Sequence, residues 1–241
     1  MTDHSFLDPL FRRWKRRVSL SDGSKQAVAA LPWTMRSYAR ENYLAPEGEP
    51  TSSCMLLVSG YAYRQKLVSN GARQIISFHI PGEFIDLQNA MLEVADHNVQ
   101  SLGRSTVAVV SKDALTGLMA KDFDIQRAIW LDSLVDASIF REWVVNVGRR
   151  NAKTRIAHLL CELALRLDSS RVGDGSMFDF PLTQEQIADA TGLTAVHTNR
   201  TLQSLRKEGL ISLTANQLTI LDWNKLADVG DFSERYLHHG V

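Results

Sequence analysis

The sequence predicts an α+β protein in three parts: a β-rich portion over residues 1–119, a long helix over 120–149 and a C-terminal unit over 150–241. Three observations support this division. Short runs rich in β-branched and aromatic residues alternate with turn residues in the first half. Apolar residues then recur every three to four positions through the middle of the chain. Near the end, two short amphipathic segments meet at a glycine, which predicts a pair of helices.

The first part is expected to form short strands over residues 54–58, 60–64, 74–78 and 106–110. Between the second and third of these, Ser69-Asn70-Gly71 is a typical hairpin signal. Several short strands at this spacing predict a sandwich or a barrel.

A basic run, RRWKRR, occupies residues 12–17. Contact with DNA, with an anionic membrane or with a partner protein would each suit its charge, but the solvated face of an N-terminal helix is the favoured interpretation. Leu7, Leu10 and Phe11 are expected to anchor that helix to the β-rich part.

The long helix is the strongest indication of a homodimer. At about 1.5 Å per residue it spans roughly 40 Å, too long for a small β-domain to cover alone, and it has too many apolar residues for one face. A second copy of the same helix is the simplest cover, by a coiled-coil-like contact. The alternative is a helix buried within one subunit, since no strict heptad is visible. The candidate dimerisation residues are Ile125, Ile129, Leu131, Val135 and Ile139.

The C-terminal unit begins its helix pair at Thr183, a good N-cap with Gln186 three residues on as a capping-box partner. Ile187 and Ala190 then give the first helix an apolar face. Gly192 is expected to end this helix and to allow a tight turn. The spacing therefore predicts a helix-turn-helix, and an ordinary pair of packed helices is the alternative.

The second helix of the pair is expected to start after Thr194, with Val196, Leu202 and Leu205 on its inner face. Its outer face is polar and basic, with side chains that suit base edges and phosphates in a DNA major groove. A short hairpin over residues 210–220, with its turn at 214–216, completes a winged helix. The candidate DNA-binding residues are Thr183, Thr194, Ala195, His197, Thr198, Asn199, Arg200, Gln203, Arg206 and Lys207.

Taken together, these motifs resemble the Crp/Fnr superfamily of bacterial transcription regulators. The similar segments are Thr154-Arg155-Ile156-Ala157, TQEQIADATG from residue 183, Asn199-Arg200-Thr201-Leu202 and the PGEF segment within residues 78–85. The resemblance extends from about Leu20 to Leu237. It implies an N-terminal cyclic-nucleotide-binding-like β-roll, a dimerisation helix and a C-terminal winged helix-turn-helix. It also implies that double-stranded DNA and RNA polymerase are partners.

Within this resemblance, Arg200 matches the family's arginine at the third base-reading position. The positions where members often have further reading residues, Arg or Glu, hold Ala195 and Val196 here, so the preferred half-site is expected to differ accordingly.

The resemblance places an effector pocket around the PGEF segment and the loop after it. Cyclic-AMP binders have a Gly-Glu pair and an Arg-Ser or Arg-Thr pair there, where this chain has Asp86-Leu87 and His97-Asn98. An anionic phosphate would meet Asp86 with no obvious arginine opposite it, so cyclic AMP is not expected, and the effector is unknown. The candidate pocket residues are Gly82, Glu83, Phe84, Asp86, Gln88, Asn89, His97 and Asn98.

The cysteine content excludes a further class of sensor. Oxygen sensors of this superfamily need an N-terminal cluster of cysteines for an iron–sulfur centre, and no cysteine precedes Cys54. With Cys161 as the only other cysteine, neither a disulfide framework nor a zinc cluster is indicated. No cofactor or metal is therefore expected.

The overall charge is balanced, with 27 basic and 27 acidic residues among 241, which by itself does not favour nucleic acid. The charge is uneven, however, and local clusters decide binding. We expect modest non-specific affinity for DNA. No apolar run approaches the length of a membrane span, so a cytoplasmic protein without membrane contact is expected. The clustered basic residues are Arg149, Arg150, Lys153, Arg155, Arg200, Arg206 and Lys207.

Two other functions remain as alternatives. His79, Glu83 and His97 faintly resemble the metal site of a cupin enzyme, but the close histidine pair of such sites is missing and no nucleophile–base pair stands out, so we do not expect an enzyme. A ligand-binding regulatory protein without DNA binding would leave the basic helix unexplained.

Overall fold

The computed structural model describes residues 4–168, 172–214 and 216–238. The chain forms two compact units, the first comprising residues 1–66, 76–138 and 237–241, and the second comprising 67–75 and 139–236. The boundary between them falls inside the long helix α4 (Phe123–Arg149), at Ser138 and Ile139. None of the helices in the described part of the chain combines the length and the hydrophobicity that a membrane-spanning segment needs.

The first unit is a β-roll of two sheets, one in the order β1-β7-β3 and the other in the order β2-β6-β4-β5. Strands β3 and β7 pair antiparallel with Met55 opposite Val109, which confirms strands predicted at 54–58 and 106–110. Between β4 and β5, Gly71 has a φ of +82°, as a tight hairpin turn requires. The strands are β1 (Thr34–Tyr38), β2 (Tyr43–Ala45), β3 (Ser53–Ser59), β4 (Ala62–Leu67), β5 (Arg73–His79), β6 (Asn98–Ser101) and β7 (Ser105–Ser111).

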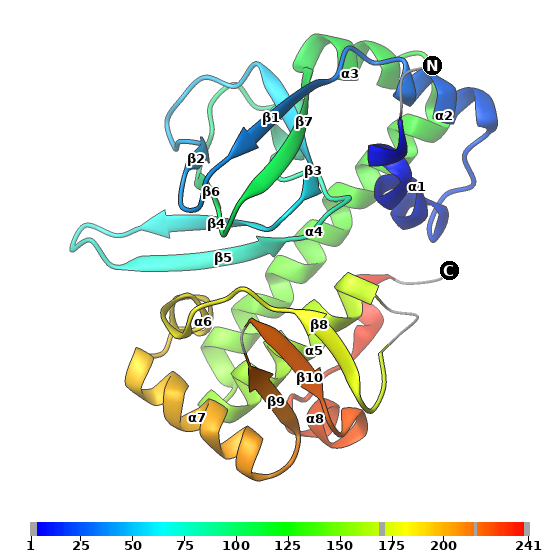
Figure 1. The fold of residues 1–241 in the computed structure, drawn as a ribbon. Coiled ribbons are helices and arrows are strands. Elements are labelled where there is room, and N and C mark those ends of the chain that lie inside the picture. Colours follow the sequence, from blue (N-terminus) through cyan, green and yellow to red (C-terminus); the bar gives the residue numbers. More distant parts are fainter. Residues whose placement is uncertain (1–3, 169–171, 215, 239–241) are drawn as a thin grey trace. The chain divides into compact units, whose positions relative to one another are not determined.

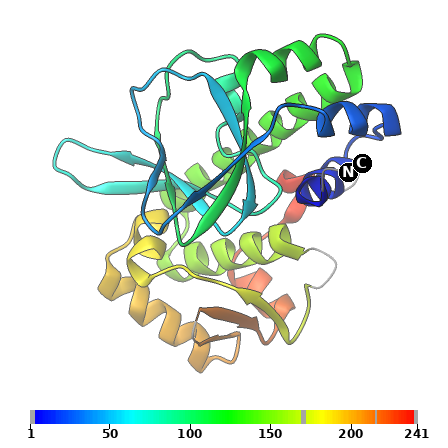
Figure 2. The same ribbon diagram turned by 45° about the horizontal axis from the view of Figure 1, so that its top comes forward.

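Helices α1 (Asp8–Lys15), α2 (Asp22–Ala29) and α3 (Lys112–Met119) pack with the first half of α4 against this roll (Figures 1 and 2). A short 3-10 turn, η2 (Leu87–Ala90), follows the PGEF segment. Leu7 and Leu10 are fully buried in the shared core and Phe11 packs against it, which confirms the predicted anchor of the N-terminal helix.

The basic run of α1 is only partly solvated, so the favoured interpretation was wrong for two of its residues. Arg13 forms ion pairs with Glu83 and Asp132, and Arg17 pairs with Asp132 at 2.8 Å. Trp14 donates its indole N–H to the same carboxylate at 2.8 Å. Because α1 and α4 are far apart in sequence, local patterning gave no sign of this cluster. Part of the run therefore docks within the fold, whereas Arg12, Lys15 and Arg16 are exposed as expected.

The face of α4 that holds the predicted dimerisation residues is turned into the protomer. Ile125, Ile129, Val135 and Ile139 are buried inside the protomer, and Leu131 is partly buried against the same core. These residues are therefore not available to a second subunit. The apolar spacing predicted the helix correctly, but it did not reveal which apolar residues the rest of the chain covers. Those left exposed on α4 are Phe123, Trp130, Leu134, Phe140, Val144 and Val145.

The second unit surrounds α5 (Ala152–Asp168) with α6 (Gln184–Thr191), α7 (Ala195–Lys207), α8 (Trp223–Val229) and a three-stranded sheet in the order β8-β10-β9. Strands β9 (Ile211–Thr214) and β10 (Gln217–Ile220) form the predicted wing hairpin, whose turn includes Ala215, outside the described residues. Strand β8 (Ser176–Asp179), which the sequence did not predict, pairs with β10 on its other edge.

A buried carboxylate holds the framework of this unit together. Glu162 of α5 has no exposed surface and accepts hydrogen bonds from the Trp143 indole at 3.0 Å and the Tyr236 hydroxyl at 2.9 Å. Arg166 neutralises it at 2.8 Å. The buried negative charge is therefore both hydrogen-bonded and ion-paired, so its burial leaves no unpaired charge in the core. The network fixes the second half of α4 against α5, from which the helix pair is positioned.

Candidate DNA-binding site

The N-terminus of α6 has the predicted capping box. The Thr183 hydroxyl accepts from the Gln186 amide at 3.2 Å, while the Gln186 side chain accepts from the Thr183 amide at 2.9 Å. Gly192 ends α6 with a φ of +64°, in the left-handed region that glycine adopts without strain. Ile187 and Ala190 are buried, as predicted. The first helix and the turn are thus confirmed.

Thr194 caps α7 by accepting a hydrogen bond from the His197 amide at 3.2 Å, which is also as predicted. Two other assignments on this helix were wrong. Thr198, expected on the outer face, is fully buried with Leu202 and Leu205, whereas Val196, expected on the inner face, is 64 % exposed. Residues two apart on a helix point in nearly opposite directions, about 200° apart. An error in the predicted position of the apolar face around the helix axis therefore exchanged the inner and outer assignments of Val196 and Thr198.

The exposed face of α7 forms what we term the central stripe: Val196, Arg200, Gln203 and Lys207, spaced at i, i+4, i+7 and i+11. All four side chains are exposed, and the three after Val196 are polar or basic. Such a stripe can enter a major groove with its N-terminal half nearest the base edges. Ala195, His197 and Arg206 flank it and are also exposed.

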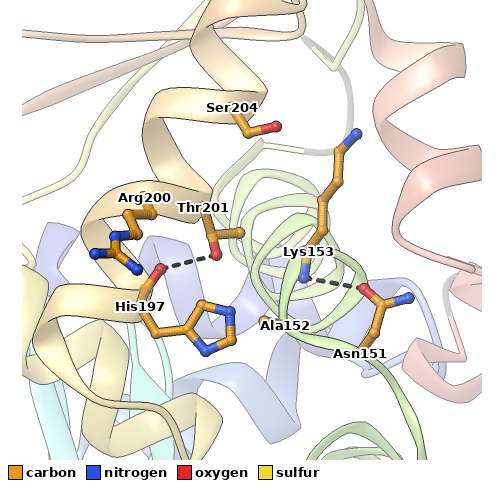
Figure 3. Close-up of a pocket in the computed structure, with 7 residues that line it drawn as sticks. All are labelled: Asn151, Ala152, Lys153, His197, Arg200, Thr201 and Ser204. Atoms are coloured by element: carbon orange, nitrogen blue, oxygen red, sulfur yellow. Dashed lines mark hydrogen bonds between the residues drawn. The ribbon is translucent and has the colours of Figure 1, made fainter.

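One side of the stripe borders a groove between α7 and the N-terminus of α5 (Figure 3). Asn151 caps α5, its side-chain oxygen accepting from the amides of Lys153 and Thr154 at 3.1 Å each. A helix N-terminus attracts anions, so this edge suits a DNA phosphate. Sequence reasoning missed it, although an Asn three residues before Thr154 is an N-cap signal. The groove has a volume of about 460 Å³ and is lined by Asn151, Ala152, Lys153, His197, Arg200, Thr201 and Ser204.

On the other side of the stripe, three side-chain amides form a chain of hydrogen bonds. Asn199 donates to the Gln184 side chain at 2.8 Å and accepts from the Gln203 side chain at 2.9 Å. Both ends of the Asn199 amide are therefore engaged within the protein. Asn199, predicted to contact a base, is placed to orient its neighbours, while Arg200 remains exposed on the central stripe.

Part of the predicted basic cluster has acidic or carbonyl partners in its own unit. Arg150 pairs with Glu142 at 2.6 Å, Lys153 pairs with Glu208 at 2.5 Å, and Arg155 donates to the Thr191 carbonyl at 2.9 Å. The carboxylates of Glu142 and Glu208 reduce the positive charge near α5, and the Thr191 carbonyl holds Arg155 within the unit. The exposed cations of α7, Arg200, Arg206 and Lys207, therefore dominate the charge of the candidate surface.

The first residues of the predicted effector pocket contact α1. A Cβ at Gly82, whose φ is +90°, would lie 2.8 Å from Pro9. Glu83 pairs with Arg13, and the Phe84 ring packs near Trp33 with centroids 6.3 Å apart. These three residues are not among those lining the cavity described below. The PGEF segment here binds the N-terminal helix.

Gln88 and His97, two further predicted pocket residues, lie near Arg64 of β4, an arginine that sequence reasoning missed. Arg64 is 7 % exposed; its guanidinium donates to the Ile85 carbonyl at 2.9 Å, to Asp136 at 2.5 Å and to the Gln88 side chain at 3.4 Å. His97 lies 3.4 Å from Gln88 and pairs with Asp96. The expectation that no arginine approaches this region was therefore wrong, but the arginine already has protein partners.

A cavity of about 120 Å³ lies behind this region, and Asp86, Asn89 and Met55 are among the residues lining it. Asp86 is 1 % exposed and accepts from the Met55 amide at 2.7 Å. Burial raises the pKa of Asp86 to about 7, against the opposing effects of that hydrogen bond and of Arg64. Asn98, the remaining candidate, accepts from the Glu47 amide at 3.0 Å.

Because the pKa of the Asp86 carboxyl is raised by folding, we expect the stability of the protein to depend on pH. Its pKa in the folded protein lies above the ordinary value of 3.8, so between about pH 4 and pH 7 the folded state holds a proton that the unfolded chain has released. We expect the free energy of unfolding to fall as pH rises through this window, by up to about 1.4 kcal/mol per pH unit. Urea titrations of Asp86→Asn, which keeps an acceptor for Met55, should show a flatter profile than the wild type. Equal slopes for the two proteins would contradict the assignment.

The three candidate ligands of a cupin-like metal site do not form one cluster. His79 lies 3.4 Å from Glu83, whereas His97 pairs with Asp96. Within residues 4–168, 172–214 and 216–238, no group of three or more His, Cys, Asp or Glu side chains is arranged to hold a metal ion. Cys54 and Cys161 are buried, and burial raises the pKa of each thiol.

Comparison with known proteins gives the same architecture. Residues 154–229 match the Crp-like helix-turn-helix domain, and residues 35–122 match the cyclic nucleotide-binding domain. This chain belongs to the Crp/Fnr superfamily of transcription regulators. The match confirms the family, the fold class and the regulatory function that the motifs predicted.

Individual relatives of this superfamily member are transcription regulators. The nitrogen fixation regulation protein FixK of Azorhizobium caulinodans is 26% identical over 214 residues, covering 87% of this chain and 85% of the relative. The transcriptional activator protein FnrL of Cereibacter sphaeroides is 26% identical over 205 residues, covering 83% and 82%. The structure of FixK2 from Bradyrhizobium japonicum superposes with a TM-score of 0.77 at 24% identity, covering 84% of this chain and all of that one.

Proposed function

We propose that this regulator binds a palindromic operator as a homodimer, with one α7 in the major groove of each half-site and half-sites about one helical turn apart. The observation that carries this proposal is the exposed central stripe with Arg200 in its middle, beside a capped helix N-terminus suited to phosphate. Binding would take place in the cytoplasm, where the DNA is, and would recruit or block RNA polymerase according to the position of the operator.

One face of α4, which the protomer leaves exposed or partly exposed, supports the homodimer. Along this face the residues are spaced by four, three, four and three positions within a continuous helix; they are Trp130, Leu134, Ala137, Arg141 and Val144. This alternation is the spacing of a coiled-coil seam. Trp130, Leu134 and Val144 are 57 %, 54 % and 54 % exposed in the protomer, so a second copy of α4 would remove substantial apolar surface from water.

We further propose that DNA binding requires neither cyclic AMP nor an iron–sulfur cluster. A cyclic phosphate would have to displace Asp136 from Arg64 and would approach a second acid at Asp86. Iron–sulfur clusters are usually held by four cysteine thiolates, and this sequence has two cysteines. Titration calorimetry with cyclic AMP should therefore give no heat of binding.

The test is selection from a randomised duplex library with purified, ligand-free protein at near-physiological salt. Enrichment of a palindrome bound in the nanomolar range supports the proposal. A dimer of good quality that enriches no sequence, with or without cyclic AMP, would refute direct operator recognition by this protein in the form proposed.

Substitutions on α7 should then separate base readout from phosphate contact. Arg200→Ala should reduce specific binding by about 1–3 kcal/mol and relax base preference at one position, because a bidentate arginine contact to guanine is lost. Lys207→Ala should weaken binding to all sequences alike and reduce the salt slope by about one, because only a phosphate contact is lost.

These affinities are measured by fluorescence anisotropy on the selected site and on random duplex, at several salt concentrations. Equal losses on both DNAs for both variants would contradict the assigned roles. The two side chains lie on the same helix, are both exposed and carry the same charge, so each variant is a matched control for the other.

A further inference from the structure

The central stripe begins with an apolar side chain that no contact within the protein explains. Val196 is 64 % exposed, while the three residues that follow it along the stripe are an arginine, a glutamine and a lysine. It lies in the first turn of α7, which Thr194 caps, and precedes Arg200 by one helical turn. The N-terminal half of such a helix approaches base edges most closely.

The chemistry of the major groove offers one apolar feature for such a side chain. Thymine presents a C5 methyl group there, whereas guanine and adenine present hydrogen-bonding groups and cytosine presents an amino donor. A valine has no donor or acceptor, so any of these polar groups pressed against it would lose water without gaining a partner. Thymine alone gains from the contact.

The stiffness of valine strengthens this discrimination. A β-branched side chain in a helix has one strongly preferred rotamer, so Val196 presents its two methyl groups in a fixed direction. It therefore loses little conformational freedom when it meets a base. Its neighbour Ala195 is also exposed and adds no polar group to this end of the stripe.

We propose that Val196 is a specificity-determining residue that recognises the methyl group of a thymine in each half-site, next to the base contacted by Arg200. This inference rests on the proposed operator binding, and it names one base of the operator by its chemistry. 5-Methylcytosine has a methyl group at the same ring position as thymine. Val196 should therefore contact 5-methylcytosine more favourably than cytosine.

The experiment uses the full-length protein and the duplex obtained by selection. Each thymine of one half-site is replaced in turn by deoxyuridine, which removes the methyl group alone. For the wild type, one replacement should weaken binding about fourfold, as expected for a buried methyl group. For Val196→Ala, that same replacement should have little effect, while replacements elsewhere should act as in the wild type.

Met177→Ala is the matched control, because Met177 is 60 % exposed on β8 of the same unit and lies outside the stripe. It should respond to deoxyuridine as the wild type does. In a second arm, cytosine and 5-methylcytosine are compared at the sensitive position. The wild type should prefer the methylated base by a similar factor, and Val196→Ala should show no preference.

The outcomes separate the inference from the proposed function. Failure to select any operator refutes the proposed function itself. A selected operator at which no deoxyuridine effect depends on Val196 overturns the inference and leaves operator binding intact. Coupling between the valine and one thymine methyl, with Met177→Ala unaffected, establishes it.

Discussion

Leu134→Glu is expected to separate the homodimer and to weaken binding to a palindromic operator by at least about 100-fold. Leu134 is 54 % exposed at the middle of the α4 seam, and the symmetry of a dimer brings the same position of both copies to one interface. Two glutamates would then lie together in an apolar contact, losing water without a counter-charge. Each separated protomer would keep one α7 and lose the avidity of the second half-site.

The measurement is molar mass by light scattering, followed by affinity for the operator and for an isolated half-site. Met91→Glu is the control, because Met91 is also exposed, at 62 %, in the same unit but outside α4. It should remain dimeric and bind normally. A Leu134→Glu protein that stays dimeric at micromolar concentration would show that another surface joins the subunits.

The helix-turn-helix was predictable because its signals are local. A capping box depends on residues three apart, and a left-handed turn depends on a single glycine, so Thr183, Gln186 and Gly192 identify the first helix and its end without knowledge of the rest of the fold. Composition and turn residues predicted β3, β4, β5 and β7 of the roll in the same way, but not the strands β1, β2 and β6.

The errors concern burial, which depends on what other parts of the chain cover. Apolar spacing identified α4 and α7 as helices, but it did not distinguish Ile129, which the protomer buries, from Trp130, which it leaves exposed. The same uncertainty of phase exchanged Val196 and Thr198 on α7. A moderately apolar helix allows several phases, and only tertiary contacts select one.

Ion pairs between residues far apart in the sequence were not predicted, for a related reason. Arg64 contacts Asp136 across 72 positions of sequence, and Arg13 contacts Asp132 across 119. No local pattern relates such residues. In the effector region, the sequence predicted that no arginine lies opposite Asp86. The structure instead places Arg64 there, already paired with Asp136.

Asp132→Ala is expected to lower the free energy of unfolding by about 3–5 kcal/mol, as is typical when one partner of a buried ion pair is removed. Asp132 is 5 % exposed and accepts from Arg13, Arg17 and the Trp14 indole. Without it, these donors remain buried with too few acceptors. Burial and the adjacent Arg13 charge lower the pKa of Arg17 to about 10, although Asp132 opposes this shift. Asp132→Ala removes that opposing effect and so further disfavours the charged guanidinium in the folded state.

Urea unfolding followed by tryptophan fluorescence and by circular dichroism would measure this loss. Asp22→Ala is the control, because Asp22 also pairs with a cation, Lys25, but its side chain is 91 % exposed. Removing an exposed pair should change stability by about 1 kcal/mol or less. A similar small loss for Asp132→Ala would mean that water reaches the cluster and that α1 is weakly docked.

A second variant tests whether charge or packing holds α1 in place. Asp132→Asn keeps the shape and one acceptor oxygen, but it removes the negative charge that compensates Arg13 and Arg17. If the ion pairs stabilise the docked helix, this variant should lose most of what Asp132→Ala loses. The effect should then be largely relieved by adding Arg17→Met, because this removes the cation that has lost its carboxylate, whereas Arg13 keeps Glu83. Additive losses in the double variant would instead indicate that each side chain contributes through packing alone.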